Sequence, residues 1–299
     1  MQTYKDINVT IIDDCSKESC AEILSNYDKL LNIRYIKLSE NHGSGYARKI
    51  GLENSNDDYI LFADSDDTFL NSFSIEKMVQ CIESDDYDFA SFGYVQEHEN
   101  LQFSSIPCNA TWIFSKIYSK EFLDKYNINF SSERFNEDVA FNQICYALAD
   151  KVHKSNDTLY LHHMNENSVT KTNDYKIDDM NSFARNYINS FQFVKSKTEL
   201  TDKICWQFID GLLILYHFYT EMIKTKDSKY CEEFYEYIKR YYNEIFEFAH
   251  ILICDDKFEE HYFNIFKSHG IHNKKLICTL DWYTFINDCE KERIKLERN

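Results

Sequence analysis

Two clusters of acidic residues follow segments that are predicted to be strands. Asp13 and Asp14 come after the apolar run 7–12, and the run 58–63 ends in Asp64-Ser65-Asp66-Asp67. In open α/β sheets, ligands bind beyond the carboxyl ends of the strands. The oxygen atoms of the second cluster suit a hard divalent cation that keeps coordination sites for a diphosphate. Such side chains also form turns and cap helices, which is the alternative for a single D-x-D and above all for Asp67.

Two further features suit a nucleotide. The carboxylate of Asp14 is a hydrogen-bond acceptor for the imide N–H of a nucleobase. Arg48 lies one turn into a helix that follows the glycine loop 41–45, where a phosphate is a natural partner for a guanidinium. The alternatives are a strand-end turn residue for Asp14 and an exposed arginine on a helix face for Arg48.

Acid–base chemistry is indicated by Glu137 and Asp138 at the start of a predicted helix. A carboxylate there can act as general base for a substrate hydroxyl, and the helix N-terminus favours its charged form. The alternative is simple complementation of the helix dipole in a first turn. His162 and His163 follow a predicted strand, where a neutral imidazole is either a metal ligand or a structural side chain. Neither HExxH nor a zinc-type spacing of Cys and His occurs in the sequence.

Composition and motif content exclude several function classes. The formal charge is −17, from 33 Lys and Arg against 50 Asp and Glu, which argues against a nucleic-acid partner. The sequence contains no P-loop, G-x-G-x-x-G or G-x-S-x-G motif. Its ten cysteines form no C-x-x-C pair, which favours free thiols in a reducing compartment. The first ten residues are polar and the most apolar stretch, 204–219, contains three polar side chains, so we expect a soluble cytoplasmic protein.

Strand-like and helix-like segments alternate in the first half of the chain, which is typical of an α/β sheet. Besides the two strands above, we expect strands at 34–38 and 89–94. Helices are expected at 18–31, at 75–82 and after the glycine loop, with Ser44 as N-cap.

The pattern changes from about residue 110. Residues 112–123 and 137–149 have helical spacing, and 152–163 is predicted to be a hairpin that turns at 155–157. Beyond about residue 175 the strand signals stop, and aromatic, Ile, Lys and Glu residues recur at helical spacing. We therefore predict an α/β domain over residues 1–175 and an α-helical region over 176–299.

Taken together and in order, these pieces resemble the family 2 glycosyltransferases of the GT-A fold. The resemblance covers residues 2 to about 172 and rests on five segments: QTYKDINVTIIDDCS, NHGSGYARKIGLENSNDDYILFADSDD, W-x-x-x-K-x-Y-x-x-x-F-L at 112–123, FNEDVAFN and YLHHMNENSVT. Each segment alone is weakly specific, but five in this order are strongly specific. The resemblance implies a GT-A-like, mostly parallel sheet flanked by helices.

The resemblance also implies roles in nucleotide and metal binding. Asp14 would read the nucleotide base with Asp13 beside it, and Arg48 would lie near the diphosphate. Asp64 and Asp66 would form the D-x-D element. Asp66 would be the foremost metal ligand, with Asp67 adjacent and His163 or His162 closing the site behind the metal. The implied cofactor is Mg²⁺ or Mn²⁺, and the expected donor is a UDP-linked sugar.

The reaction implied by the resemblance is an inverting transfer. Asp138 matches the catalytic base, and Glu137 would lie beside the acceptor. Asp138 would take the proton of the acceptor hydroxyl as that oxygen attacks the anomeric carbon. The implied partners are a nucleotide sugar and a glycan or lipid-linked acceptor, as for a hexosyl- or N-acetylhexosaminyltransferase in polysaccharide or glycoconjugate synthesis.

The start of the sequence departs from the family pattern. Cys15 replaces the small residue usual in the D-D-x-S turn, and Met1 directly precedes the segment that begins at Gln2. The family's first strand would then be missing between the strands at 7–12 and 58–63. We expect these two strands to close together directly or another segment to fill the slot, with a nucleotide pocket open on the base side.

Two other function classes compete with a metal-dependent glycosyltransferase. One is a catalytically weak sugar-nucleotide-binding or assembly module on the same fold, suggested by the missing strand. The other is a sugar-nucleotide nucleotidyltransferase, whose glycine-rich N-terminal phosphate loop and lysine the sequence lacks. For region 176–299 we expect packing on the catalytic domain, with homodimer formation or peripheral contact with a membrane as alternatives.

Overall fold

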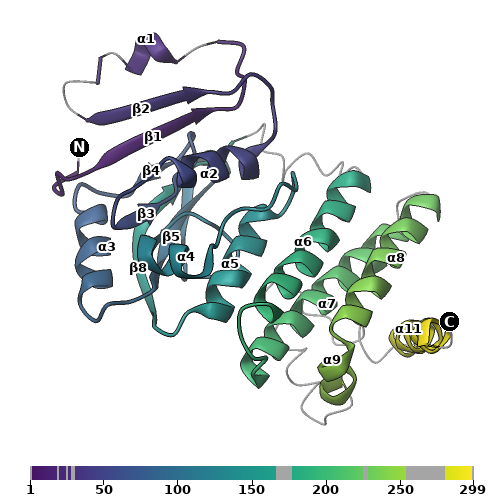
Figure 1. Cartoon of the computed structure of the whole chain (residues 1–299). Coiled ribbons are helices and arrows are strands. Elements are labelled where there is room, and N and C mark those ends of the chain that lie inside the picture. The colour runs from purple at the N-terminus through teal and green to yellow at the C-terminus, as the bar shows by residue number, and fades with distance from the viewer. Residues whose placement is uncertain are drawn as a thin grey trace. The chain divides into compact units, whose positions relative to one another are not determined.

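The chain folds as two compact units, Met1–Lys176 and Ile177–Asn299. The computed structural model describes residues 2–18, 20–24, 26–27, 31–165, 177–224, 228–253 and 280–297. Strands and helices alternate in the first unit, and the described elements of the second are all helices (Figure 1). None of the described helices is both long and apolar enough to span a membrane.

The first unit begins with a small sheet of two parallel strands. β1 (Asn8–Asp13) pairs with β2 (Asn32–Lys37), from Asn8 opposite Asn32 to Asp13 opposite Lys37. The helix expected at 18–31 is described only as α1 (Ala21–Leu24), because several residues around it lie outside the described ranges. α2 (Ser44–Glu53) follows the glycine loop, as predicted.

A second sheet holds six strands in the order β3-β7-β5-β8-β4, with β6 paired to the outer part of β5. The strands are β3 (Tyr59–Leu61), β4 (Thr68–Phe69), β5 (Phe89–His98), β6 (Gln102–Ile106), β7 (Lys116–Ser119) and β8 (Val152–His162). β5 and β8 run parallel, and the other pairs are antiparallel. The α/β class is confirmed, but the sheet is mixed rather than mostly parallel, because β7 inserts between β3 and β5 in the opposite direction.

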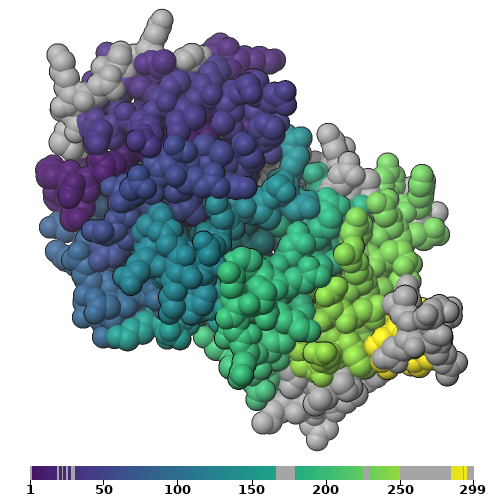
Figure 2. Space-filling view, in the orientation of Figure 1, coloured from purple at the N-terminus to yellow at the C-terminus, as the bar shows by residue number. Residues whose placement is uncertain are grey.

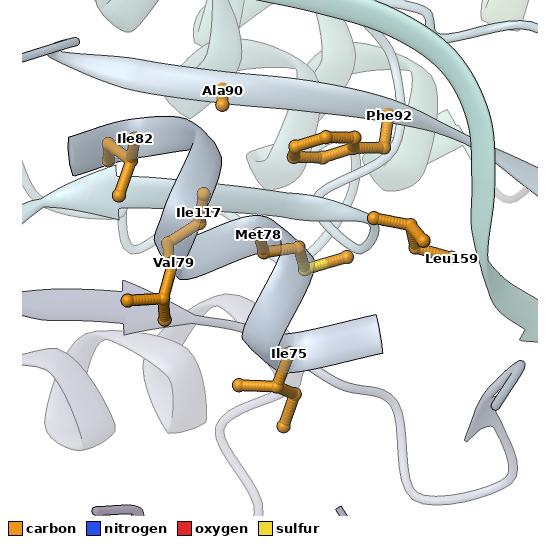
Figure 3. Packing of buried hydrophobic residues seen from close by; sticks show 8 residues of the cluster. All are labelled: Ile75, Met78, Val79, Ile82, Ala90, Phe92, Ile117 and Leu159. Atoms are coloured by element: carbon orange, nitrogen blue, oxygen red, sulfur yellow. The ribbon is translucent and has the colours of Figure 1, made fainter. Parts of the chain in front are cut away.

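Helices cover both faces of this six-stranded sheet. α3 (Ser74–Glu83) packs on one face, where its apolar side chains meet Ala90, Phe92, Ile117 and Leu159 (Figure 3). α5 (Glu137–Leu148) covers the other face, where Tyr118 stacks on Phe89 and meets Phe141 edge-on. Neighbouring residues of β7 therefore point to opposite helices, as the pleat of a strand requires. Figure 2 shows the atoms on the surface of the protein in the orientation of Figure 1.

Two elements differ from the prediction. Residues 112–123 are not one helix: β7 comes first, and α4 (Lys120–Tyr126) begins after Ser119, whose side chain accepts a hydrogen bond from the Phe122 amide at 3.3 Å. The predicted hairpin at 152–163 is wrong as well, because β8 is one strand. Its polar residues 155–157 form an irregularity opposite Gly93, where the register moves from Ser91–Lys154 to Gly93–Thr158. Polar turn-forming residues thus produced a bulge instead of a turn.

Among the described residues, β1 pairs with β2 alone and β3 with β7 alone. The expectation that β1 and β3 close together directly is therefore wrong for these residues. A side-chain hydrogen bond from Asn8 to Asp57 links the two regions instead. Tyr4 and Ile7, which precede β1, pack against the core beneath α3.

The second unit contains α6 (Ile177–Lys195), α7 (Asp202–Met222), α8 (Ser228–Glu244), α9 (Phe246–Ile253) and α11 (Leu280–Glu297). Aromatic side chains form much of its core, as the helical spacing predicts. Tyr241 is fully buried and donates a hydrogen bond to the Phe208 carbonyl at 2.8 Å. Gly211 lets α6 and α7 approach closely, since a Cβ at this position would lie 2.5 Å from the ring of Tyr187.

Candidate active site

The loop before α2 is fastened to the end of β1 by Asp14. The two carboxylate oxygens of Asp14 accept hydrogen bonds from the backbone N–H groups of His42 and Gly43 at 2.8 and 2.7 Å. Gly43 has a φ of +92°, which favours glycine. Gly43, and not the predicted Ser44, occupies the N-cap position of α2. Asp14 is only partly buried, so its remaining lone pairs stay within reach of a ligand at this sheet end.

Asp13, its neighbour, is a structural residue in this fold. Its carboxylate accepts hydrogen bonds from the Tyr35 hydroxyl at 2.5 Å and the Ser16 amide at 2.7 Å, and Lys37 lies 3.6 Å away. The Tyr35 hydrogen bond is the main cause that lowers the pKa of Asp13 to about 2. Asp13 is 6% exposed and fastens β1 to β2.

Arg48 joins two acidic residues that are far apart in the sequence. Its Nη2 lies 2.6 Å from Asp64 Oδ1, and its Nη1 lies 2.6 Å from Glu137 Oε1. The Ser44 hydroxyl donates to the same Glu137 oxygen at 2.5 Å. Glu137 is buried, so its carboxylate is held by α2 and is not open to solvent. Arg48 thereby ties α2 to the loop after β3 and to the first turn of α5.

The acidic loop after β3 divides its side chains between structure and solvent. Asp67 has a fully buried carboxylate, which accepts a hydrogen bond from the His163 amide at 2.9 Å and lies 3.1 Å from His162 Nδ1. Asp66 is exposed, and its Oδ2 accepts a hydrogen bond from the Asn165 side chain at 2.7 Å. Asp67 therefore fixes the loop, while Asp66 presents a carboxylate to solvent.

The two histidines at the end of β8 each pair with a different carboxylate. The hydrogen bond to Asp67 is the main cause that raises the pKa of His162. His163 Nδ1 lies 2.8 Å from Glu97 Oε2, and its Nε2 lies 3.1 Å from Thr68 Oγ1. In the tautomer in which Nδ1–H donates to Glu97, Nε2 is the acceptor, and this is the tautomer that a cation requires. Residues 166–170 of the fifth segment quoted above lie outside the described residues.

Asp138 occupies the first turn of α5 beside Glu137. Its Oδ1 accepts a hydrogen bond from the Val139 amide at 2.8 Å. Burial, and next the charge of Glu137, raise the pKa of Asp138 to about 7, and the charge of Arg48 opposes that rise. A carboxyl group with this pKa can accept a proton near neutral pH and is a stronger base than an ordinary carboxylate.

The acidic side chains do not form a ready-made metal cage. Among the described residues, no group of three or more His, Cys, Asp or Glu side chains converges on one point. Asp64 is paired with Arg48 and Asp67 is buried, which leaves the exposed Asp66. One carboxylate is enough for Mg²⁺ or Mn²⁺ when substrate phosphates and water supply the other ligands, so the residues fit a cation that binds together with a diphosphate.

Sequence reasoning missed three contributors. Ser44 was expected to be a cap but binds Glu137, and Glu97, which orients His163, had no motif to point to it. Lys116 is 2% exposed on β7, although it is part of the W-x-x-x-K segment at 112–123. A strand assignment for 116–119 would have turned Lys116 toward the same face as Tyr118 and singled it out.

Comparison with known proteins identifies similar sequences and folds. Residues 1–135 match the model of the family described as "Glycosyl transferase family 2". The glycosyltransferase EpsJ of Bacillus subtilis, described as uncharacterized, is 24% identical in an alignment 195 residues long that covers 57% of this chain and 56% of EpsJ. Glycosyltransferase GlyA of Streptococcus pneumoniae is 25% identical in an alignment 197 residues long that covers 57% of this chain and 28% of GlyA. The chain thus spans about half or less of the length of these relatives.

Solved structures share the fold. The crystal structure of S. aureus TarS 1–349 in complex with UDP has a TM-score of 0.69 and 16% identity, and the match covers 91% of this chain and 82% of that one. The complex of the same protein with UDP-GlcNAc has a TM-score of 0.68 and 16% identity, over 90% of this chain and 84% of that one. At this identity the likeness establishes the fold alone. Most of the first unit therefore matches the model of glycosyltransferase family 2, over residues 1–135.

Proposed function

We propose that the protein is an inverting glycosyltransferase that moves a sugar from a nucleoside diphosphate to a hydroxyl of a glycan or glycoconjugate acceptor. The observation that carries this proposal is the position of Asp138: a partly buried carboxyl with a pKa raised to about 7, in the turn that Arg48 connects to the acidic loop after β3. The match of residues 1–135 to the family 2 model and the fold shared with a protein solved in complex with UDP-GlcNAc support it.

Asp138 is the base in this proposal. It takes the proton of the acceptor hydroxyl while that oxygen forms a bond to the anomeric carbon of the donor sugar. The bond from this carbon to the diphosphate oxygen breaks, and its electron pair leaves with the nucleoside diphosphate. Attack opposite the leaving group inverts the anomeric centre. Glu137 keeps the turn in place through Ser44 and Arg48, so we assign it a positioning role.

Asp14 and Asp66 bind the donor in this proposal. Asp14 accepts a hydrogen bond from the imide N–H of the base, which fits a uracil and hence a UDP-linked sugar. Asp66 would hold a divalent cation, and His163 Nε2 would be a further ligand once it releases Thr68. When bound, the cation stabilises the negative charge of the diphosphate as it leaves. We place Arg48 beside this charge as a bridge between Asp64 and Glu137.

One observation favours a second candidate, a sugar-nucleotide-binding module without turnover. Both amino groups of the Arg48 guanidinium that could meet a diphosphate already contact carboxylates. If these ion pairs persist with nucleotide bound, the charge of the leaving diphosphate is less well compensated and transfer is slow. Affinity for the nucleotide without consumption of its sugar would identify this module.

A screen for turnover separates the two candidates, and Asp138→Asn then tests the role of Asp138. A panel of nucleotide sugars is screened with Mn²⁺ and Mg²⁺ for release of the nucleoside diphosphate, with and without glycan acceptors. For an active pair, Asp138→Asn should lower transfer by about 10² or more and leave the affinity for the nucleotide nearly unchanged. Asp150→Asn is the matched control, because the Asp150 side chain is 82% exposed and lies at the far end of α5. Equal loss of transfer and affinity in Asp138→Asn would assign this residue to folding or donor binding instead.

A further inference from the structure

A lysine is buried on the face of β7 that is covered by α5. Lys116 is 2% exposed, and the pleat of β7 turns it, like Tyr118, away from Ile117 and the α3 side of the sheet. A buried ammonium group is costly unless neighbouring groups compensate its charge. The reaction proposed above gives Lys116 no role, so this cost calls for an explanation.

Hydrogen bonds connect Lys116 to α5 through one carbonyl group. The Lys116 ammonium donates to the Trp112 carbonyl oxygen. The same oxygen accepts a hydrogen bond from Asn142 Nδ2 at 3.1 Å, and Asn142 Oδ1 accepts one from the Tyr118 hydroxyl at 2.8 Å. Asn142 is completely buried and lies one turn after Asp138 on α5. The network therefore fixes the first turns of α5 against β7 and the segment before it.

The charges around Asp138 are predominantly negative. Glu137 on its own helix and Asp64 after β3 both raise the pKa of Asp138, and Arg48 on α2 lowers it. Arg48, however, is shared between Glu137 and Asp64. A second positive charge on the β7 side would compensate the remaining carboxylate, that of Asp138.

The shared Trp112 carbonyl places Lys116 beside the stretch of α5 that begins with Asp138. Burial lowers the pKa of Lys116 to about 7, and the charge of Asp138 is the first of the influences that oppose this, ahead of Cys108 and Cys145. The Lys116 ammonium is buried, whereas the Asp138 carboxyl is only partly buried. Water therefore screens the attraction between their opposite charges only in part.

We propose that Lys116 is a positioning residue for Asp138: it anchors α5 through the Trp112 carbonyl and Asn142, and its buried positive charge keeps the Asp138 carboxylate ionised until the acceptor hydroxyl arrives. This inference rests on the proposed role of Asp138 as the base. As Asp138 takes up the proton, the ammonium loses its counter-charge, so the pair links proton transfer to the packing of β7 against α5.

The first test compares Lys116→Met with Lys116→Arg. Methionine keeps the length and the apolar stem of lysine but removes the charge, and arginine keeps the charge. Without the charge, the pH at which kcat/KM falls off on the acidic side should move up by about one unit, which makes the variant about tenfold slower well below that pH and nearly normal well above it. Lys116→Arg should keep the acidic limb of the wild-type pH profile of kcat/KM. The Kd for UDP should stay within about twofold of the wild-type value in both variants.

Asn142→Ala is the control for a purely structural role. It removes the partner of the Trp112 carbonyl without changing any charge, so it should lower the melting temperature and leave the acidic limb in place. An acidic limb in Lys116→Met that coincides with that of the wild type would overturn the proposal, whatever happens to stability.

A reciprocal measurement needs neither turnover nor a folded Lys116→Met. The titration of Lys116 is followed by NMR of its side-chain ¹³Cε and ¹⁵Nζ in the wild type and in Asp138→Asn. Loss of the Asp138 charge should lower the pKa of Lys116, since coupling between two sites is mutual. An unchanged Lys116 titration would refute the coupling. A lowered pKa in a protein that transfers no sugar would keep the coupling and reject the proposed function.

Discussion

Gly45 and Glu137 fit together so closely that residue 45 has no room for a side chain. A Cβ atom at this position would lie 2.7 Å from Glu137 Cγ and 3.2 Å from the Glu133 carbonyl oxygen. The first turn of α2 and the first turn of α5 therefore approach each other at a glycine, and the Arg48–Glu137 ion pair closes the contact. The family segment NHGSGYAR is thus explained in part by the space that Glu137 needs.

Gly45→Ala should displace Glu137 and destabilise the protein. Overpacking of this kind costs about 1–3 kcal/mol, and the ion pair with Arg48 is strained as well. Chemical denaturation measures the cost. Gly51→Ala is the matched control in the same helix, because its Cβ would meet Ile12 Cγ1 at an ordinary 3.6 Å, and alanine favours the helix. If both variants were equally stable, the close approach of Gly45 to Glu137 would be of no consequence.

Asp66→Ala should remove the cation dependence of nucleotide binding. A hard cation depends on carboxylate oxygen, and Asp66 is the exposed carboxylate of its loop. Titration calorimetry with UDP, in Mn²⁺ and in EDTA, measures the effect. Asp67→Ala serves for comparison. The buried Asp67 carboxylate contacts His162 and the His163 amide, so this variant should lose stability of the fold rather than only cation-dependent affinity. Unchanged Mn²⁺-dependent affinity in folded Asp66→Ala would make residues 64–67 a structural turn.

Asp138 should control both the pH dependence of activity and that of stability. Activity should rise as the pH passes through about 7, because the base acts when deprotonated. The folded-state pKa of Asp138 lies above that of an unfolded aspartate. The stability of the folded protein therefore falls as the pH rises from the unfolded-state pKa to about 7, because the folded state ionises Asp138 less readily. Asp138→Asn should therefore be more stable than the wild type at pH 8.5, and the difference in stability should be smaller at pH 5. Melting temperatures that differ equally at both pH values would contradict the raised pKa.

Asp13 should have the opposite effect at low pH. Its pKa is lowered to about 2, chiefly by the Tyr35 hydroxyl, so its stabilising effect is complete above the unfolded-state value and is lost as the pH falls through about 2. Asp13→Asn should be less stable than the wild type at pH 6, and the gap should narrow toward pH 2. Tyr35→Phe should reproduce part of this behaviour. A gap that is independent of pH would mean that packing, and not ionisation, explains the loss.

The elements with a strong local pattern were predicted well from the sequence. α3 and α5 show clear helical spacing, and β5 is a long apolar strand bounded by acidic residues. β7 was missed because Lys116–Ser119 is only four residues long and its identity as a strand depends on partners in β3 and β5. A contact such as that between Arg48 and Glu137, which are 89 positions apart, has no signature in local spacing. The sequence therefore indicated which residues gather at the site, but not how they pair.

The division of the first unit into two separately hydrogen-bonded sheets has a mechanical consequence. Asp14 belongs to the β1–β2 sheet, whereas Asp66 follows β3 in the six-stranded sheet. A nucleotide that contacts both residues would add a connection between the two sheets to those that Asn8 and Arg48 already make. Donor binding should then slow amide hydrogen exchange across β1 and β2 more than across β5 and β8, because the latter are already braced by strand neighbours on both sides. The donor would in this way stabilise the part of its own binding site that β1 and β2 form.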